Sequence, residues 1–168
     1  DYAVEGGEKN EAGFDRACEE FIRVIHYAPS QPKIPFISMK VTGFARFELL
    51  EKLDHSVETA SGSLMKCYAS ALASLTEAEL AEWNRVRARM QQICEAAAAK
   101  RIGILVDAEE TWIQDPVDVL GIQMMEQFNK QEGIVYNTVQ LYRRDRLGFL
   151  KDMLEAARIK HFVLAVKL

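Results

Sequence analysis

Four stretches of the chain are almost continuously apolar and end in a polar residue. They cover residues 36–42, 102–107, 134–141 and 162–168; the second ends abruptly at Asp107, and in the last two the polar residue is the last but one. A run of β-branched and apolar residues with little alternation is typical of a strand that is buried on both faces, as parallel strands are in α/β folds. The pattern therefore predicts four strands, adjacent in chain order.

Outside these stretches the apolar residues recur every three or four positions, which predicts helices. Thr76 and Glu79 form a T-x-x-E capping box, and Asp115 followed by Pro116 predicts an N-cap with proline at the first helical position. The predicted helices cover Glu11 to Ala28, Arg46 to Leu53, Glu77 to Ala99, a helix that begins at Asp115 to Pro116, and Arg143 to Lys160.

The order of these elements predicts a parallel sheet, because no hairpin turn separates the strands and each connection must then be a crossover. Residues 55–99 carry no strand pattern, and we expect a helical insert there, since a strand–helix–strand unit needs only about thirty residues. Two architectures fit: an open doubly wound sheet, or part of a (βα)8 barrel. A barrel takes about 250 residues, so the second alternative makes this 168-residue chain a fragment.

Each predicted strand carries a polar residue near its C-terminal end: Lys40, Asp107, Gln140 and Lys167. A single residue of this kind usually marks a strand end that meets water. Four of them, in register at four strand ends, favour a common site, because α/β folds place their active sites at the C-terminal ends of the strands. A barrel, which gathers these ends around one axis, explains them better than an open sheet.

Composition and charge narrow the function classes. The formal net charge is −4 and no basic cluster occurs, which argues against nucleic acid as a partner. Histidines lack the spacing of common metal motifs. Three cysteines, Cys18, Cys67 and Cys94, lie far apart in the sequence, and we expect them to be buried thiols in a reducing compartment.

Five motifs occur in a fixed order: DYAVEGG, SMKVTGFAR, LVDAEET, NTVQLYRRD and LAVKL. With them the chain resembles the proline dehydrogenase family, the FAD-dependent proline oxidases, over all but the predicted insert. The resemblance implies an α/β fold, a partial (βα)8 barrel with FAD at the C-terminal ends of the strands. Residues 1–168 would form its N-terminal half, roughly strands one to five, with residues 55–99 as an insert within it.

The resemblance also implies an activity, the oxidation of L-proline to 1-pyrroline-5-carboxylate with electrons passed to a quinone in proline catabolism. A bacterial member would lie in the cytoplasm, peripheral to the inner membrane, and a eukaryotic one in mitochondria. The partners expected are L-proline, the quinone and the remaining half of the barrel. We expect residues 1–168 alone neither to oxidise proline nor to retain FAD.

Site residues follow from the motifs that match. Lys40 would hold the substrate carboxylate with a buried ammonium, and Asp107 and Ala108 would lie beside the flavin. Gln140 would bind the flavin's pyrimidine edge, since an amide offers both a donor and an acceptor. Lys167 would lie near flavin N5 and, with Lys40, belong to the catalytic group.

Three further positions are assigned at the ends of the chain. The resemblance places Asp1 and Leu168 at the substrate, and it makes Glu5 part of a gate at the mouth of the site.

Two other functions remain open on the residues alone. One is a metal-dependent barrel lyase or isomerase that uses Asp107 and Glu109, although alternation would turn Glu110 to the other face. The other is a non-catalytic domain whose helical insert binds a partner. Flavin absorbance would separate all three.

Overall fold

The computed structural model describes residues 9–31, 33–60 and 63–168. Its strands form one sheet in the order β1-β2-β3-β4, and every neighbouring pair is parallel. The predicted strands, their order and their direction are therefore confirmed, although each strand is shorter than its apolar stretch. The strands are β1 (Phe36–Met39), β2 (Gly103–Val106), β3 (Val135–Thr138) and β4 (Val166–Lys167).

Helices fill the connections, as the apolar period predicts. The α-helices are α1 (Glu11–Tyr27), α2 (Phe47–Glu58), α3 (Leu64–Ala73), α4 (Glu77–Lys100), α5 (Gln114–Phe128) and α6 (Arg146–Lys160). Short 3-10 helices are η1 (Ala28–Ser30), η2 (Val41–Gly43) and η3 (Thr111–Ile113). The pattern did not predict α3, and α2 extends five residues further than expected.

The start of α4 confirms the predicted capping box. The Thr76 hydroxyl accepts a hydrogen bond from the Glu79 N–H at 3.3 Å, and the Glu79 carboxylate accepts one from the Thr76 N–H at 2.8 Å. Two donors that helix geometry leaves unpaired are thereby satisfied. The helix ends at Lys100, and the C-cap residue Arg101, with a left-handed φ of 54°, closes the last turn.

The predicted N-cap of α5 is wrong. This helix begins at Gln114, directly after η3, and its N-cap is Ile113, which supplies no capping side chain. Asp115 lies in the first turn, where its N–H donates to the Asp54 carboxylate of α2 at 2.8 Å. Asp54 is buried, so a carboxylate from another helix performs the capping that the sequence suggested for Asp115 itself.

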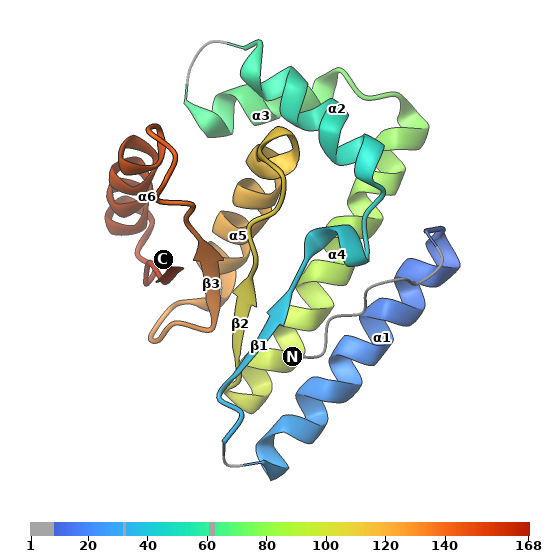
Figure 1. The fold of residues 1–168 in the computed structure, drawn as a ribbon, viewed down its shortest axis with the longest axis vertical. Coiled ribbons are helices and arrows are strands. Elements are labelled where there is room, and N and C mark those ends of the chain that lie inside the picture. Colours follow the sequence, from blue (N-terminus) through green and yellow to red (C-terminus); the bar gives the residue numbers. More distant parts are fainter. Residues whose placement is uncertain (1–8, 32, 61–62) are drawn as a thin grey trace.

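Helices α4 and α5 pack against the sheet, and α1 packs against α4. In Figure 1, α2 and α3 lie across the end of the molecule toward which the strand arrows point, so they cover the region beyond the C-terminal strand ends. The main apolar core includes outward-facing strand residues such as Met39, Ile104 and Val135. The opposite row of side chains, which includes Phe36, Leu105 and Tyr136, stays at least partly accessible.

The boundaries of the insert, residues 55–99, stay a prediction. The structure adds that α4 contacts β2 as well as α1 and α5, so this helix also serves as the packed crossover between β1 and β2. Within the described ranges, no helix is long and apolar enough to cross a membrane.

Candidate functional site

The sheet register aligns polar residues across the C-terminal ends of the four strands. Met39 pairs with Val106 and Thr138 pairs with Lys167. The residues one position beyond the last β1–β2 and β2–β3 pairs are Lys40, Asp107 and Thr138. They therefore lie in one row with Lys167, on the face of the sheet that α4 and α5 leave free. Backbone hydrogen bonds from Asp107 N–H to Met39 and from Val139 N–H to Lys167 extend the ladder at this level.

Gln140 lies one level above this row, which differs from the common level that the sequence suggested. Thr138 occupies the position in register with Asp107 and Lys167, but its hydroxyl donates to the Val106 carbonyl at 2.7 Å. Gln140, two residues further on the same side of the strand, meets Glu109 instead. The row therefore holds two lysines, one aspartate and one threonine, and the Gln140 amide stands above it.

An open cavity of about 1350 Å³ borders this row. Lys40, Asp107, Ala108 and Lys167 all line it, together with apolar groups such as Phe44. Lys40 is exposed rather than buried, contrary to expectation, because the cavity at the strand end is open. The structure thus brings these four predicted residues around one space.

Asp107 and Lys167 form an ion pair across the sheet, from β2 to β4, with Lys167 Nζ bound to Asp107 Oδ1. The side chains remain 25% and 39% exposed, so solvent screens their attraction and the pair adds little to stability. The pair matters for position, because the Asp107 carboxylate holds the Lys167 ammonium on the inner face of the sheet. The ammonium has two further N–H donors for a ligand.

Glu109 connects three strand ends. Its carboxylate accepts hydrogen bonds from the Thr42 hydroxyl and from the Thr42 N–H, the latter at 3.2 Å. Its own N–H donates to Gln114 Oε1 at 2.9 Å, and its carbonyl accepts from Gln140 Nε2 at 2.9 Å. Burial raises the pKa of the Glu109 carboxyl above its ordinary value, and the hydrogen bonds from Thr42 oppose this only in part.

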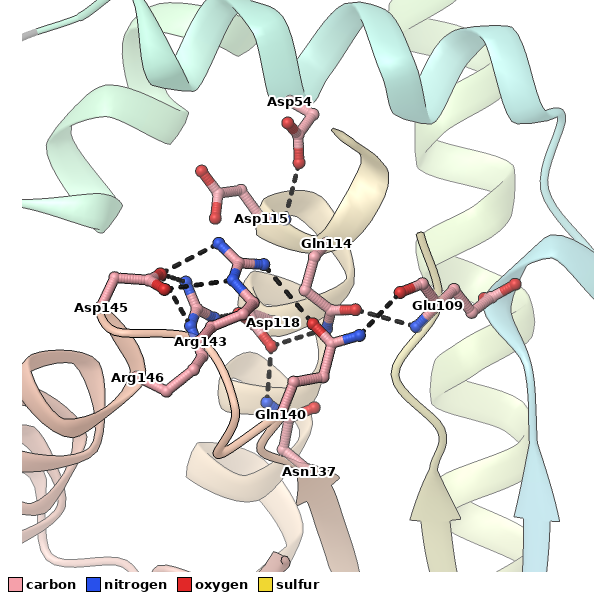
Figure 2. A network of polar contacts seen from close by, with 10 residues as sticks. All are labelled: Asp54, Glu109, Gln114, Asp115, Asp118, Asn137, Gln140, Arg143, Asp145 and Arg146. Carbon is pink, nitrogen blue, oxygen red and sulfur yellow. Dashed lines mark hydrogen bonds and ion pairs between the residues drawn. The ribbon is translucent and has the colours of Figure 1, made fainter. Parts of the chain in front are cut away.

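A buried polar cluster lies behind Gln140, and the sequence analysis missed it (Figure 2). Asp118 on α5 is 1% exposed and pairs with Arg146 of α6 at 2.6 Å. Among the basic residues of α6, Arg146 is buried and forms salt bridges with Asp118 and Asp145. A signal was present, since Asp118 interrupts the apolar stretch PVDVLGI, where a buried charge needs a partner.

Three of the assigned positions gain no structural support. Asp1 and Glu5 lie outside the described residues. Leu168 follows Lys167 directly and is 72% exposed.

The carboxylates proposed for a metal site have other partners. Asp107 binds Lys167, whereas Glu109 binds Thr42. Across the described ranges, no three His, Cys, Asp or Glu residues are grouped so as to hold a metal ion. The cysteines are buried free thiols, as predicted, and burial raises the pKa of Cys18 to about 11.

Comparison with known proteins gives several relatives. The carbapenem antibiotics biosynthesis protein CarD of Pectobacterium carotovorum subsp. carotovorum is 30% identical over 167 residues, covering 99% of the chain and 40% of that protein. The mitochondrial proline dehydrogenase 1 of Dictyostelium discoideum is 28% identical, covering 96% of the chain and 32% of that protein. Hydroxyproline dehydrogenase of Xenopus laevis is 30% identical, covering 80% and 31%. The chain thus spans less than half the length of these relatives.

Among solved structures, a bifunctional proline utilization A (PutA) protein matches with a TM-score of 0.63 at 15% identity, over 98% of this chain and 15% of that one. This match and the parallel sheet confirm the predicted fold class, an α/β fold with part of a (βα)8 barrel. The proline dehydrogenase family matches residues 1–168 in full. The chain therefore belongs to the proline dehydrogenase family.

Proposed function

We propose that the protein oxidises L-proline to 1-pyrroline-5-carboxylate with bound FAD and passes the electrons to a quinone. The observation that carries this proposal is the match of the whole chain to the family, together with the row of Lys40, Asp107 and Lys167 that lines one cavity at the strand ends. An oxidoreductase acting on proline is also what several relatives' names describe.

The residues around the cavity suit a flavin. Its lining combines charged groups, among them Lys40 and Lys167, with apolar ones such as Ala108 and Phe44. A flat ring system with hydrogen-bonding edges needs such a mixed surface. FAD, when bound, supplies the redox chemistry by accepting a hydride from the substrate. In this proposal Asp107, Ala108, Gln140 and Lys167 are the residues of this chain that hold it.

Lys40 is the residue proposed to bind the carboxylate of L-proline. It stands on β1 at the same level as Asp107, and its ammonium lines the cavity. Asp107 holds Lys167 against the end of β2, and the proposal assigns Lys40 to the substrate side of the cavity. A cation beside an anionic substrate is both an attraction and a positioning contact.

The proposal also covers the place of these residues in the barrel and the location of the protein in the cell. Residues 1–168 form the N-terminal half of the barrel, and the protein acts at the bacterial inner membrane from the cytoplasmic side or, in a eukaryotic source, in mitochondria. The second location follows the names of relatives from Dictyostelium discoideum and Schizosaccharomyces pombe, which are described as mitochondrial. Cell fractionation followed by extraction with salt tests the peripheral association.

The decisive measurement is the visible spectrum of the purified protein, in the form that its source produces. We expect a flavin spectrum that L-proline bleaches under anaerobic conditions. A 4-hydroxyproline arm is included, because a hydroxyproline dehydrogenase is among the relatives. Bleaching by 4-hydroxyproline alone would replace the proposed substrate, and a colourless protein that does not bind added FAD would reject the function.

Substitution separates substrate residues from flavin residues. Lys40→Ala should raise the KM for proline about tenfold to 100-fold, because a charge-assisted contact is lost, and leave the flavin content unchanged. Gln140→Ala and Asp107→Ala should instead lower the flavin content first. Lys33→Ala, a change at an exposed lysine before β1, is the control. Unaltered kinetics in Lys40→Ala at both low and saturating proline would contradict the assignment.

A further inference from the structure

Gln140 is part of a closed ring of hydrogen bonds that runs from the strand ends into the helix layer (Figure 2). Each link joins one residue to the next, and the last returns to the first. The ring consists of Glu109, Gln114, Asp118, Arg146, Asp145, Arg143 and Gln140. It connects the segment that follows β2, α5, α6 and the loop that follows β3, so it spans four separate segments.

The ring determines which way the Gln140 amide points. Its Oε1 faces Arg143 Nη1 at 3.5 Å, and its Nε2 donates to the Glu109 carbonyl at 2.9 Å. A guanidinium only donates and a carbonyl only accepts, so exchanging the amide oxygen and nitrogen would place like groups against each other on both sides. One N–H and one lone pair of the amide remain for a ligand.

Asp118 and Arg146 anchor the far side of this ring. The Asp118 carboxylate accepts from Gln114 Nε2 at 2.9 Å, from Asn137 Nδ2 at 2.8 Å and from Arg146 Nη1 at 2.6 Å. Burial raises the pKa of the Asp118 carboxyl, and these donors oppose the effect. All of its partners donate, and an ionised carboxylate, which accepts on both oxygens, satisfies them without a carboxyl proton that would need an acceptor of its own.

Arg146 connects Asp118 to the residues that hold Gln140. It is 6% exposed, and its guanidinium lies 4.6 Å over the Phe149 ring. Its Nε donates to Asp145 Oδ2 at 2.8 Å, and Asp145 in turn accepts from Arg143 Nη2 at 2.9 Å. Burial alone would lower the pKa of Arg146, but its carboxylate partners outweigh burial and raise it, so the link stays charged.

We propose that Asp118 and Arg146 are positioning residues for Gln140: acting through Asp145 and Arg143, they hold its amide in one orientation toward the cofactor. The orientation itself is a property of this chain. Its consequence for FAD rests on the proposed function, because the ring then decides where the free N–H and the free lone pair of Gln140 lie. None of Asp118, Arg146 and Gln140 lines the cavity. Gln140 is the one of the three that is only partly buried, so an effect of the other two on a ligand passes through it.

The first test observes the Gln140 side-chain amide directly by ¹⁵N NMR. The sample is the protein as its source produces it, and the signal is assigned by its loss in Gln140→Ala. We expect a dispersed, slowly exchanging pair of Nε2 protons in the native protein. Asp118→Asn offers one acceptor oxygen and brings an amide NH₂ against donors. It should move this signal to the position of a solvent-exposed glutamine and speed its exchange at least about tenfold. Arg146→Lys, which keeps the charge but loses the fork, should give an intermediate shift.

The matched control is Asn129→Ala. Asn129 is fully buried and binds the start of β3, at the opposite end of the strand from Gln140. Its loss should lower the melting temperature without moving the Gln140 signal. A Gln140 signal that is unchanged in Asp118→Asn, or one that moves equally in Asn129→Ala, would overturn the positioning role.

The second test is a double-mutant cycle in which the dissociation constant of FAD from the apoprotein is measured for each variant. Asp118→Asn should weaken FAD binding about tenfold in the native background, as when a residue that orients a ligand-binding side chain is removed. In the Gln140→Ala background it should change binding less than about twofold. The melting temperature of the apoprotein should fall alike in both backgrounds.

The outcomes separate the two proposals. Equal weakening of FAD binding in both backgrounds would mean that Asp118 acts on the fold rather than through Gln140, which contradicts the inference. A native protein that binds no FAD would reject the proposed function, and the NMR result would then decide the orientation of the amide by itself.

Discussion

At the scale of single residues, Glu109 has a role that its residue type does not indicate. In the sequence it is the second acid of LVDAEET and a candidate metal ligand. In the structure its carboxylate holds Thr42, two residues beyond Lys40, and its carbonyl holds Gln140. Glu109 therefore links the segment that follows Lys40 to Gln140, a predicted flavin residue.

The raised pKa of Glu109 gives a prediction for stability against pH. In the folded protein the carboxyl binds its proton more tightly than in the unfolded chain, so the free energy of unfolding should fall as pH rises from its ordinary value of 4.5 through the folded pKa. Below that window the penalty is absent, and above it the penalty is complete. Urea unfolding across this range should show a flatter profile for Glu109→Gln.

Thr42→Val supplies the second arm of this experiment. The hydrogen bonds from Thr42 lower the pKa of Glu109, so removing the hydroxyl should raise it further and carry the decline in stability to higher pH. Glu155→Gln, at an exposed acid of α6 that does not act on Glu109, is the control. Identical profiles for native protein and Glu109→Gln would show that this carboxyl does not titrate differently in the two states.

At the scale of elements, the position of Gly103 in β2 is set by aromatic packing. Phe36 and Tyr136, from the strands on either side, meet edge to face with ring centroids 5.3 Å apart. A Cβ on Gly103 would lie 2.3 Å from Phe36 Cδ1. The two rings therefore cross the space that a side chain on β2 would fill.

Two glycine-to-alanine changes should act in opposite directions. Gly103→Ala should lower the free energy of unfolding by about 1–3 kcal/mol, because Phe36 must turn away from Tyr136. Gly148→Ala, in α6, meets nothing within 4 Å and should raise it by about 0.5–1 kcal/mol through helix propensity. Chemical denaturation measures both, and a neutral Gly103→Ala would show that the ring moves without cost.

The capping box of α4 gives a prediction for a whole helix. Thr76→Ala removes the acceptor for the Glu79 N–H and should lower the free energy of unfolding by about 1 kcal/mol. Thr59→Ala is the matched control, since the Thr59 hydroxyl only donates to carbonyls near the end of α2. Hydrogen exchange in the first turn of α4 should rise only in Thr76→Ala. Protection that stays unchanged there would contradict a capping role.

At the scale of the whole molecule, apolar surface gathers on α6. Leu147 and Leu154 are 61% and 42% exposed, and a spacing of seven residues places them on one side of the helix. Exposed apolar patches of this kind mark surfaces that associate. The inner face of the sheet adds Phe36, which is also largely exposed.

We therefore predict that residues 1–168 alone associate in solution, retain no FAD and do not oxidise proline. Light scattering and the visible spectrum measure these properties. Leu147→Glu combined with Leu154→Lys should reduce the association, whereas Asp152→Lys, on another side of α6, should not. A monomeric, yellow product that proline bleaches would contradict all parts of this prediction.

The sequence by itself determined the four strands, the helices other than α3, the parallel order and the family. Strand and helix periods, the capping box of α4 and the lack of hairpin turns are local signals, and the structure confirms what they predict. The start of α5 was misplaced because the Asp54 carboxylate that caps it comes from 61 residues away. Local patterns report only on interactions within their own window.

The tertiary structure alone decided which polar groups meet. Thr42 and Glu109 are 67 residues apart, Gln140 and Glu109 are 31 apart, and Asp118 and Arg146 are 28 apart. Register placed Thr138 rather than Gln140 level with Asp107, and the docking of α5 and α6 buried Arg146 against Asp118. These contacts depend on how strands pair and helices pack across the sheet, because a shift of one residue in register turns every side chain to the other face.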